Sequence, residues 1–327
     1  HLAAFLDHLA QHGAGAFGIP SLHGLAASRH RILHVISQPD RPAGRGNVST
    51  PAPVAQWALD RGLPLTRTAD VNAPELLTMI RDLKPDALVV IAFGQKLSND
   101  LLAIAPANIN LHSSLLPKYR GAAPINWAVI NNDPEAGVCV LDVTPVMDAG
   151  DILAEARTPI GETETAGELH DRLADLGAPL LPAVLDQLAA GTAHRTPQDS
   201  RLATRAPKLS REKAWVDFSR PAAVVSARIR GMSPWPGIQV EVFDSEGKLR
   251  TTATLLKCRA MDSGEHSPEQ CGRVLPDRTI ACGLGRLELL TVQPAGKKPM
   301  DAAAFANGYG LRGGARLRSL VAPPSPQ

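Results

Sequence analysis

The first 195 residues alternate between short apolar runs and longer segments in which apolar positions recur at helical spacing. Residues 86–92 are apolar almost throughout over the length of one strand, which is typical of a parallel strand covered on both faces. We predict further strands at 31–36, 109–112 and 137–141, and helices at 20–27, 53–61, 74–83, 167–176 and 179–190. This alternation predicts an α/β domain over residues 1–195 with a Rossmann-like, open, mostly parallel sheet.

The pattern changes after residue 195. Residues 196–210 are polar with few core positions, and we predict that they form a linker. A helix is expected at 221–230, and short strands broken by turns are expected at 239–243, 249–258, 272–274, 279–282 and 287–292. Short strands at this density predict a small OB-like β-barrel domain over residues 211–320, followed by a disordered tail at 321–327.

The composition is that of a folded protein. Its 327 residues suit about two domains of roughly 150 residues each, and a hydrophobic content of 44% excludes a disordered chain. The four cysteines lack metal-ligand spacing and are too few for a disulfide scaffold, so no metal site is expected. No stretch approaches ~18 uninterrupted apolar residues and no charged-then-apolar leader is present, so we expect a cytoplasmic protein without a membrane partner.

The formal net charge of +2 is the sum of two oppositely charged parts. Residues 1–200 carry 14 basic and 21 acidic side chains, whereas residues 201–327 carry 20 basic and 11 acidic ones. A basic domain could bind a polyanion, because lysines and arginines release counterions from phosphates. The alternative is a solvated basic surface that balances an acidic partner domain, and charge alone does not decide between the two.

A glycine motif near the start of the chain, Gly13–Gly18, matches the G-x-G-x-x-G pattern of dinucleotide-binding turns. That function requires a strand before the motif, a helix after it and an acidic residue after the next strand. The helix is predicted, but residues 1–12 have apolar spacing closer to a helix, and Ser37 and Gln38 occupy the acidic position. A tight turn without a dinucleotide is therefore favoured, and an NAD-dependent dehydrogenase stays an alternative.

Asn110 and His112 are two residues apart near the end of a predicted strand, so their side chains share one face. Ligands of open α/β sheets bind at the carboxyl ends of strands. An amide and an imidazole that converge there could stabilise a developing oxyanion. A carboxylate such as Asp148 could orient the imidazole and raise its basicity. The alternative is a polar pair that is satisfied at the strand end.

Three segments around these residues carry a family resemblance. The chain reads Asn-Leu-His-Ser-Ser-Leu-Leu-Pro over 110–117, Tyr-Arg-Gly-Ala-Ala-Pro-Ile over 119–125 and Met-Asp-Ala-Gly-Asp-Ile over 147–152. It resembles the folate-dependent formyltransferases in these segments. More narrowly, segments 38–46 and 293–298 resemble the branch of that family that formylates methionyl-tRNA. The motifs lie in order over both predicted domains at family-like spacing.

The resemblance implies a formyltransferase domain followed by a tRNA-binding domain. It implies that a monomer without a metal transfers formyl from 10-formyltetrahydrofolate to initiator methionyl-tRNA, and that Asn110, His112 and Asp148 form the catalytic trio. The folate co-substrate would contact Ala92, Phe93, Gly94, Gln95, Ser114, Leu115, Leu116 and Pro117, and the tRNA or its methionine would contact Phe17, Arg45, Lys208, Lys297 and Lys298. For each lysine, a solvated surface charge is the alternative.

The sequence departs from the family's pattern in three places. Residues 1–12 have helical spacing where the family has a strand. Asn47 and Val48 replace basic residues, and Thr144–Val146 replaces an acidic-x-Gly run. Three other functions therefore stay open: a folate-linked formyltransferase or hydrolase that acts on an amino sugar, an inactive tRNA-binding module, and the dehydrogenase named above.

Overall fold

The structure is a computed structural model that describes residues 2–6, 16–43, 48–92 and 95–323. The chain forms two compact units. Unit 1 consists of residues 1–124, 136–158 and 170–207, and unit 2 consists of residues 125–135, 159–169 and 208–327. Two short segments of the predicted first domain, residues 125–135 and 159–169, therefore belong to the same unit as the C-terminal part.

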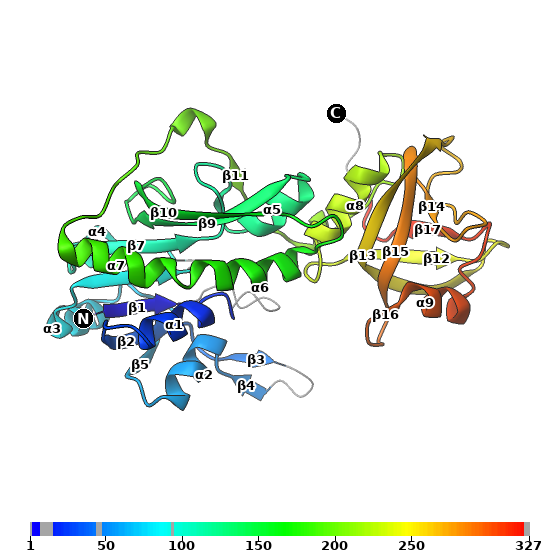
Figure 1. The fold of residues 1–327 in the computed structure, drawn as a ribbon. Helices are drawn as coiled ribbons and strands as arrows, with labels where there is room; N and C mark the ends of the chain where they lie inside the picture. Colours follow the sequence, from blue (N-terminus) through cyan, green and yellow to red (C-terminus); the bar gives the residue numbers. More distant parts are fainter. Residues whose placement is uncertain (1, 7–15, 44–47, 93–94, 324–327) are drawn as a thin grey trace. The chain divides into compact units, whose positions relative to one another are not determined.

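Unit 1 contains, within the described residues, a seven-stranded sheet in the order β10-β9-β7-β6-β1-β2-β5 (Figure 1). Its strands are β1 Leu2–Leu6, β2 Ile32–Ser37, β5 Leu65–Arg67, β6 Ala87–Ile91, β7 Ala107–His112, β9 Glu135–Asp142 and β10 Ile152–Pro159. The neighbours from β5 to β7 pair in parallel, whereas β9 is antiparallel to β7. The predicted Rossmann-like, mostly parallel α/β sheet is confirmed.

Helices connect these strands. Five of them lie at the predicted positions, namely α1 Ile19–Ala26, α2 Pro53–Asp60, α3 Pro74–Leu83, α6 Ala166–Gly177 and α7 Leu180–Ala190. The sequence did not predict α4 Asn99–Leu102, nor α5 Pro124–Ile130, most of which belongs to unit 2. In the core of unit 1, Leu77 and Ile80 of α3 belong to the same cluster as Leu88 and Val90 of β6. The long apolar strand β6 is thus covered by a helix, as its composition predicts.

In the part of the chain that the structure describes, one helical stretch has the length and composition to cross a membrane, Ala166–Ala190, which contains α6 and α7. The core helix of a soluble protein passes the same test. In this protein Leu173, Leu181 and Leu185 of the stretch are buried in the fold.

The start of the chain corrects one prediction. The helical character expected for residues 1–12 is wrong for Leu2–Leu6, because these residues form β1, which pairs in parallel with β2 and β6. Hydrogen bonding to strands on both sides outweighs the weak local periodicity of so short a segment. The strand required before the glycine motif is therefore present, while residues 7–15 lie outside the described residues.

Two short pairings lie beside the main sheet of unit 1. Strands β3 Arg41–Ala43 and β4 Val48–Thr50 form an antiparallel pair. Strand β8 Arg120–Gly121 pairs in parallel with β11 Arg205–Ala206, which comes from the predicted linker. The same segment contains a 3-10 helix, Ser200–Leu202. Part of the predicted linker is therefore regular structure of unit 1.

Unit 2 contains a second sheet in the order β14-β15-β13-β12-β17, with β16 paired to β15, and its described pairings are antiparallel. The strands are β12 Ile238–Phe243, β13 Leu249–Glu265, β14 Ile280–Ala281, β15 Leu284–Pro294, β16 Met300–Asp301 and β17 Arg316–Ser319. The helices are the 3-10 turn Arg211–Lys213, α8 Ala222–Gly231, which contacts β13 and β15, and α9 Ala302–Tyr309. Register shifts along β13 mark bulges that curl the sheet. The predicted OB-like domain is confirmed.

Residues 272–274, predicted as a strand, form single bridges instead. Val274 pairs with Ile280 of β14, and Arg273 pairs with Arg316 of β17. Because β14 and β17 are the two edges of the sheet, these bridges join its ends. A segment too short to be assigned as a strand therefore closes the barrel.

Candidate active site

Asn110 and His112 lie at the carboxyl end of β7, between the parallel strand β6 and the antiparallel strand β9. His112 is buried and Asn110 is partly exposed. Among the described residues, the side chain of Asn110 makes no hydrogen bond. Its amide is therefore available to donate to a bound molecule, and the alternative of a satisfied polar pair does not describe Asn110.

The two ring nitrogens of His112 face different oxygens. Nε2 lies 3.0 Å from the carbonyl oxygen of Tyr119, which can only accept, so Nε2 is the donor in this contact. Nδ1 lies 3.8 Å from Oδ1 of Asp148. That distance is within the range of an ion pair and too long for a hydrogen bond. The contact with Tyr119 fixes the ring and turns Nδ1 toward the carboxylate.

Asp148 lies in the loop between β9 and β10. Its backbone has a φ of +53°, in the left-handed region that non-glycine residues rarely adopt. Its Oδ2 accepts a hydrogen bond of 2.8 Å from the backbone N–H of Gly121. The structure therefore brings Asp148 to His112, and a backbone donor from a second loop holds the carboxylate there.

The loop before Asp148 has the unusual run Thr144–Val146. The hydroxyl of Thr144 donates to the carbonyl of Val146 at 2.9 Å, which closes a local turn. After Asp148 the loop passes so close to β9 that a Cβ on Gly150 would lie 1.8 Å from the carbonyl oxygen of Asp142. Only glycine fits at this position, and the altered run still permits the contact between Asp148 and His112.

The segment predicted as a linker contributes to the same site. The hydroxyl of Thr204 accepts from the backbone N–H of Tyr119 at 2.9 Å. The carbonyl of Ala206 accepts from the N–H of Ala122 at 2.9 Å. Gln198 contacts both loops, as described below. No periodicity or motif marks these residues in the sequence, because their role depends on polar contacts across a large sequence separation.

The predicted folate segment that follows β6 is described in part. Ala92 has a φ of +48°, and Phe93 and Gly94 lie outside the described residues. The Oε1 atom of Gln95 accepts from the N–H of Val71 at 2.9 Å. Its Nε2 is buried and has no hydrogen-bond partner among the described residues. A buried amide donor with no partner is costly unless a ligand accepts from it, so this atom fits a polar co-substrate.

The second predicted folate segment is a compact turn that follows β7. Ser114 donates through its hydroxyl to the carbonyl of Lys118 at 2.7 Å. Leu115 packs so tightly on Gly137 that a Cβ there would lie 2.4 Å from its Cδ2. Leu116 is buried in a cluster with two residues of β9, and a cis peptide bond joins it to Pro117. This turn therefore has a fixed shape beside His112.

The residues predicted to contact tRNA or methionine do not form one cluster in the described structure. Phe17 is 3% exposed, and its ring meets that of His170 edge-on at 5.3 Å, which leaves little of it for a ligand. Arg45 lies outside the described residues. Lys208 is exposed at the start of the C-terminal part of unit 2. Lys297 and Lys298 are exposed on the turn between β15 and β16.

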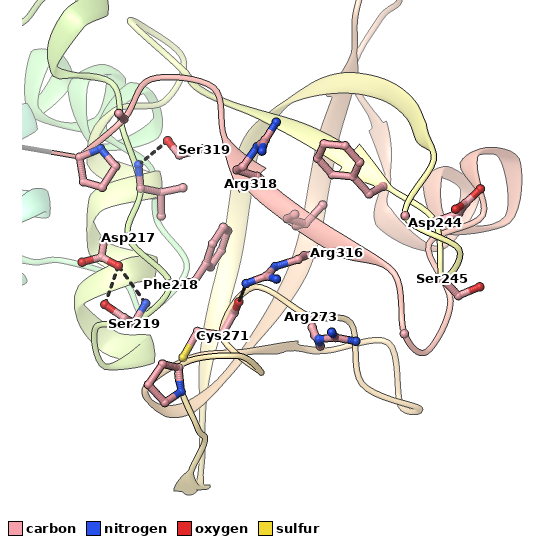
Figure 2. Close-up of a pocket in the computed structure, with 18 residues that line it drawn as sticks. Asp217, Phe218, Ser219, Asp244, Ser245, Cys271, Arg273, Arg316, Arg318 and Ser319 are labelled. Carbon is pink, nitrogen blue, oxygen red and sulfur yellow. Dashed lines mark hydrogen bonds between the residues drawn. The ribbon is translucent and has the colours of Figure 1, made fainter.

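Unit 2 also has a hollow of about 660 Å³ (Figure 2). Arg273, Arg316 and Arg318 line it. Arg318 pairs with Glu241 at 2.7 Å and Arg316 donates to the carbonyl of Cys271 at 3.4 Å, so part of this basic charge is already used. None of the residues that we predicted for the site lines this hollow.

The described residues contain no group of three histidine, cysteine, aspartate or glutamate side chains that could hold a metal ion. The four cysteines are buried and free. Burial raises the pKa of the Cys139 and Cys258 thiols to about 12, so neither is a nucleophile at neutral pH.

Comparisons with known proteins match both parts of the chain. The model of a family described as Formyl transferase matches residues 12–185, and one described as Formyl transferase, C-terminal domain, matches residues 208–310. A protein named methionyl-tRNA formyltransferase from Moorella thermoacetica is 42% identical over 302 residues, which are 91% of this chain and 94% of the relative. The protein of the same name from Citrifermentans bemidjiense is 40% identical over 93% of this chain and 94% of its own length.

Solved structures share the fold at much lower identity. The sugar 3N-formyl transferase WlaRD, solved with dTDP and 5-N-formyl-THF, has a TM-score of 0.61 and 15% identity over 91% of this chain and 98% of its own. An N-formyltransferase from Helicobacter canadensis, in complex with folinic acid and dTDP-3-aminofucose, has a TM-score of 0.62 and 15% identity over 90% and 98%. At this identity the likeness shows the fold alone.

Proposed function

We propose, since the chain belongs to the formyl transferase family, that it transfers the formyl group of 10-formyltetrahydrofolate to the α-amine of initiator methionyl-tRNA. The structural observation that carries the proposal is the approach of Asp148 to His112 at the end of β7. An imidazole with a carboxylate at one nitrogen and a fixed acceptor at the other is suited to proton transfer. The free amide of Asn110 supplies a donor beside it.

The reaction forms a bond between the amine nitrogen and the formyl carbon, and then breaks the bond from that carbon to N10 of the folate. Negative charge develops on the formyl oxygen in the tetrahedral intermediate. Asn110 and the Nδ1–H of protonated His112 stabilise this oxygen, because the Nε2–H already donates to the carbonyl of Tyr119. Removing one such donor costs on the order of 10²–10³ in rate.

Asp148 orients His112 and assists the transfer of the proton from the attacking amine to the leaving N10 nitrogen. Its position 3.8 Å from Nδ1 supports this role, because a carboxylate at this distance can orient the ring and stabilise its protonated form. The proton lost by the amine is the one gained by the leaving group, and no bond to the protein forms, because the amine attacks the formyl carbon directly.

The co-substrate contacts the segments 92–95 and 114–117 in this proposal. The unpartnered Nε2 of Gln95 supports that assignment, because the pterin and its amide groups offer acceptors for a buried donor. The tRNA contacts Arg45, Lys208, Lys297 and Lys298, which we carry over from the family resemblance, whereas the buried Phe17 offers little surface to a ligand. The excess of basic residues after residue 200 supports a polyanionic partner for unit 2. The protein acts as a cytoplasmic monomer without a membrane partner.

The test is a formyl-transfer assay with the variant His112→Ala. We expect transfer to charged initiator tRNA by the unmodified protein and its loss in the variant, with the affinity for tRNA unchanged. His194→Ala is the matched control, because His194 is exposed in unit 1. An active His112→Ala protein would overturn the assignment of the site, and transfer to amino sugars but not to tRNA would overturn the acceptor.

A further inference from the structure

Gln198, in the segment predicted as a linker, uses its whole side-chain amide inside the candidate site. Its Nε2 donates to the carbonyl oxygen of Asp148 at 2.9 Å and to that of Gly150 at 2.7 Å. Its Oε1 accepts from Nη2 of Arg120 at 2.7 Å and from Nε of Arg120 at 3.2 Å. Both donor hydrogens and the acceptor oxygen are therefore occupied, which is the full capacity of a glutamine amide.

These contacts join the two loops that meet at the carboxylate of Asp148. Arg120 directly precedes Gly121, whose N–H donates to Oδ2 of Asp148 at 2.8 Å. Gln198 thus donates to the backbone carbonyl of Asp148 and accepts from the side chain of Arg120, the residue next to Gly121. A shift of either loop alters the position of the carboxylate relative to His112.

The conformation of Asp148 requires such support. A non-glycine residue in the left-handed region persists when its surroundings over-determine it. Asp148 has a φ of +53°, and two hydrogen bonds from the amide of Gln198 reach the carbonyls of this residue and of Gly150. Thr204 supports the other loop, through the N–H groups of Tyr119 and Arg120.

We propose that Gln198 is a positioning residue that fixes the carboxylate of Asp148 against His112 by linking the loops of Asp148 and Arg120. This inference rests on the proposed function, because it assigns Gln198 to the site that carries out formyl transfer. Gln198 does not reach the reacting atoms in this role. It acts through the position of the Asp148 carboxylate. The rate of formyl transfer depends on that position, since a misplacement of about 1 Å can lower a rate roughly 10²-fold.

The variant Gln198→Glu tests the proposal with almost no change in size. The glutamate keeps an acceptor for Arg120, but it places a second oxygen against the two carbonyls that now receive donors. We expect kcat for formyl transfer to fall about 10²-fold, with KM for methionyl-tRNA changed by less than about three-fold. Gln187→Glu is the matched control, because it makes the same chemical change on the exposed side of α7 and should leave kcat unchanged.

A second measurement needs no substrate. In protein labelled with ¹⁵N-histidine, Gln198→Glu should shift the ring resonances of His112, and Gln187→Glu should not. Unmodified kcat or unmoved His112 resonances in folded Gln198→Glu would overturn the positioning role. If the glutamate variant does not fold, Gln198→Met is used, because methionine also lacks the two donors. The same two measurements then decide, and an unchanged kcat or unmoved His112 resonances would again overturn the positioning role. An unmodified protein without formyl transfer would overturn the proposed function instead, while the resonances still test the positioning role.

Discussion

Replacing Asp148 by asparagine removes one charge and almost no volume. Oδ2 of Asp148 accepts from the N–H of Gly121 at 2.8 Å, and an amide nitrogen cannot accept this hydrogen bond. The asparagine must therefore turn its oxygen toward Gly121, which leaves its NH₂ group facing Nδ1 of His112. The variant keeps the loop contact and replaces the carboxylate beside the imidazole by a neutral donor.

The size of the effect follows from the distance and the burial of the pair. When His112 is protonated in the reaction, it and Asp148 are opposite unit charges 3.8 Å apart, which interact by about 4 kcal/mol at an effective dielectric constant of about 20. The side chains of His112 and Asp148 are 7% and 12% exposed, so solvent screens the pair only in part. Since about 1.4 kcal/mol corresponds to a factor of ten in rate, we expect kcat for Asp148→Asn to fall by about 10²–10³.

The assay is single-turnover formyl transfer from 10-formyltetrahydrofolate to charged initiator tRNA, with the dissociation constant for the tRNA measured beside it. The dissociation constant should not change, because Asp148 acts on the reacting proton in this mechanism. Asp82→Asn, on the exposed side of α3, is the control and should react at the unmodified rate. A rate above one-tenth of the unmodified value in Asp148→Asn would refute the charge-based role.

Three further changes test other parts of the structure. Gly150→Ala should lower the stability by about 1–3 kcal/mol or more and reduce transfer, because its Cβ would meet the carbonyl of Asp142 at 1.8 Å; an unchanged melting temperature would contradict this packing. Replacing Lys297 and Lys298 together by alanine should weaken tRNA binding and reduce the slope of log K against log salt by about one to two, whereas an unchanged slope would argue for solvated charges. Burial raises the pKa of Cys258 from 9.0 to about 12, so folding favours its protonated thiol. The contribution of this thiol to the free energy of unfolding is complete below pH 9 and is lost as the pH rises toward 12. The unfolding free energy in urea should therefore fall between pH 9 and pH 11 by about 1.4 kcal/mol per unit more in the unmodified protein than in Cys258→Ser, and parallel pH curves would contradict it.

Local pattern predicted those elements whose own residues supply most of their stabilisation. The helix predicted at 74–83 is α3 at Pro74–Leu83, and the apolar run at 86–92 contains β6. Pattern failed at β1, where stability comes from pairing with two strands distant in sequence. It also failed to separate a strand from the single bridges of residues 272–274, because such bridges depend on partners supplied by both edges of the barrel.

The candidate site was predictable only in part, for a similar reason. The spacing of Asn110 and His112 placed both on one face, and the strand end placed them where ligands bind. The carbonyl of Tyr119 as the partner of Nε2 could not be predicted, because any backbone carbonyl can accept and sequence does not distinguish them. The buried donor of Gln95 has no sequence signal either, since its partnership depends on the packing around it.

The polar composition of residues 196–210 has a structural reason beyond solvation. Polar side chains in a segment with few core positions suggest exposure, yet Gln198 and Thr204 direct their polar atoms at the backbone groups of two loops. A loop that curves around a site leaves N–H and C=O groups without regular partners, and these groups require acceptors and donors from elsewhere. An apolar segment could not supply them. Substitutions at Gln198 and Thr204 should therefore affect the site. A substitution at Leu202 of the same segment should not, because this side chain is 62% exposed and has no polar atom that could bind either loop.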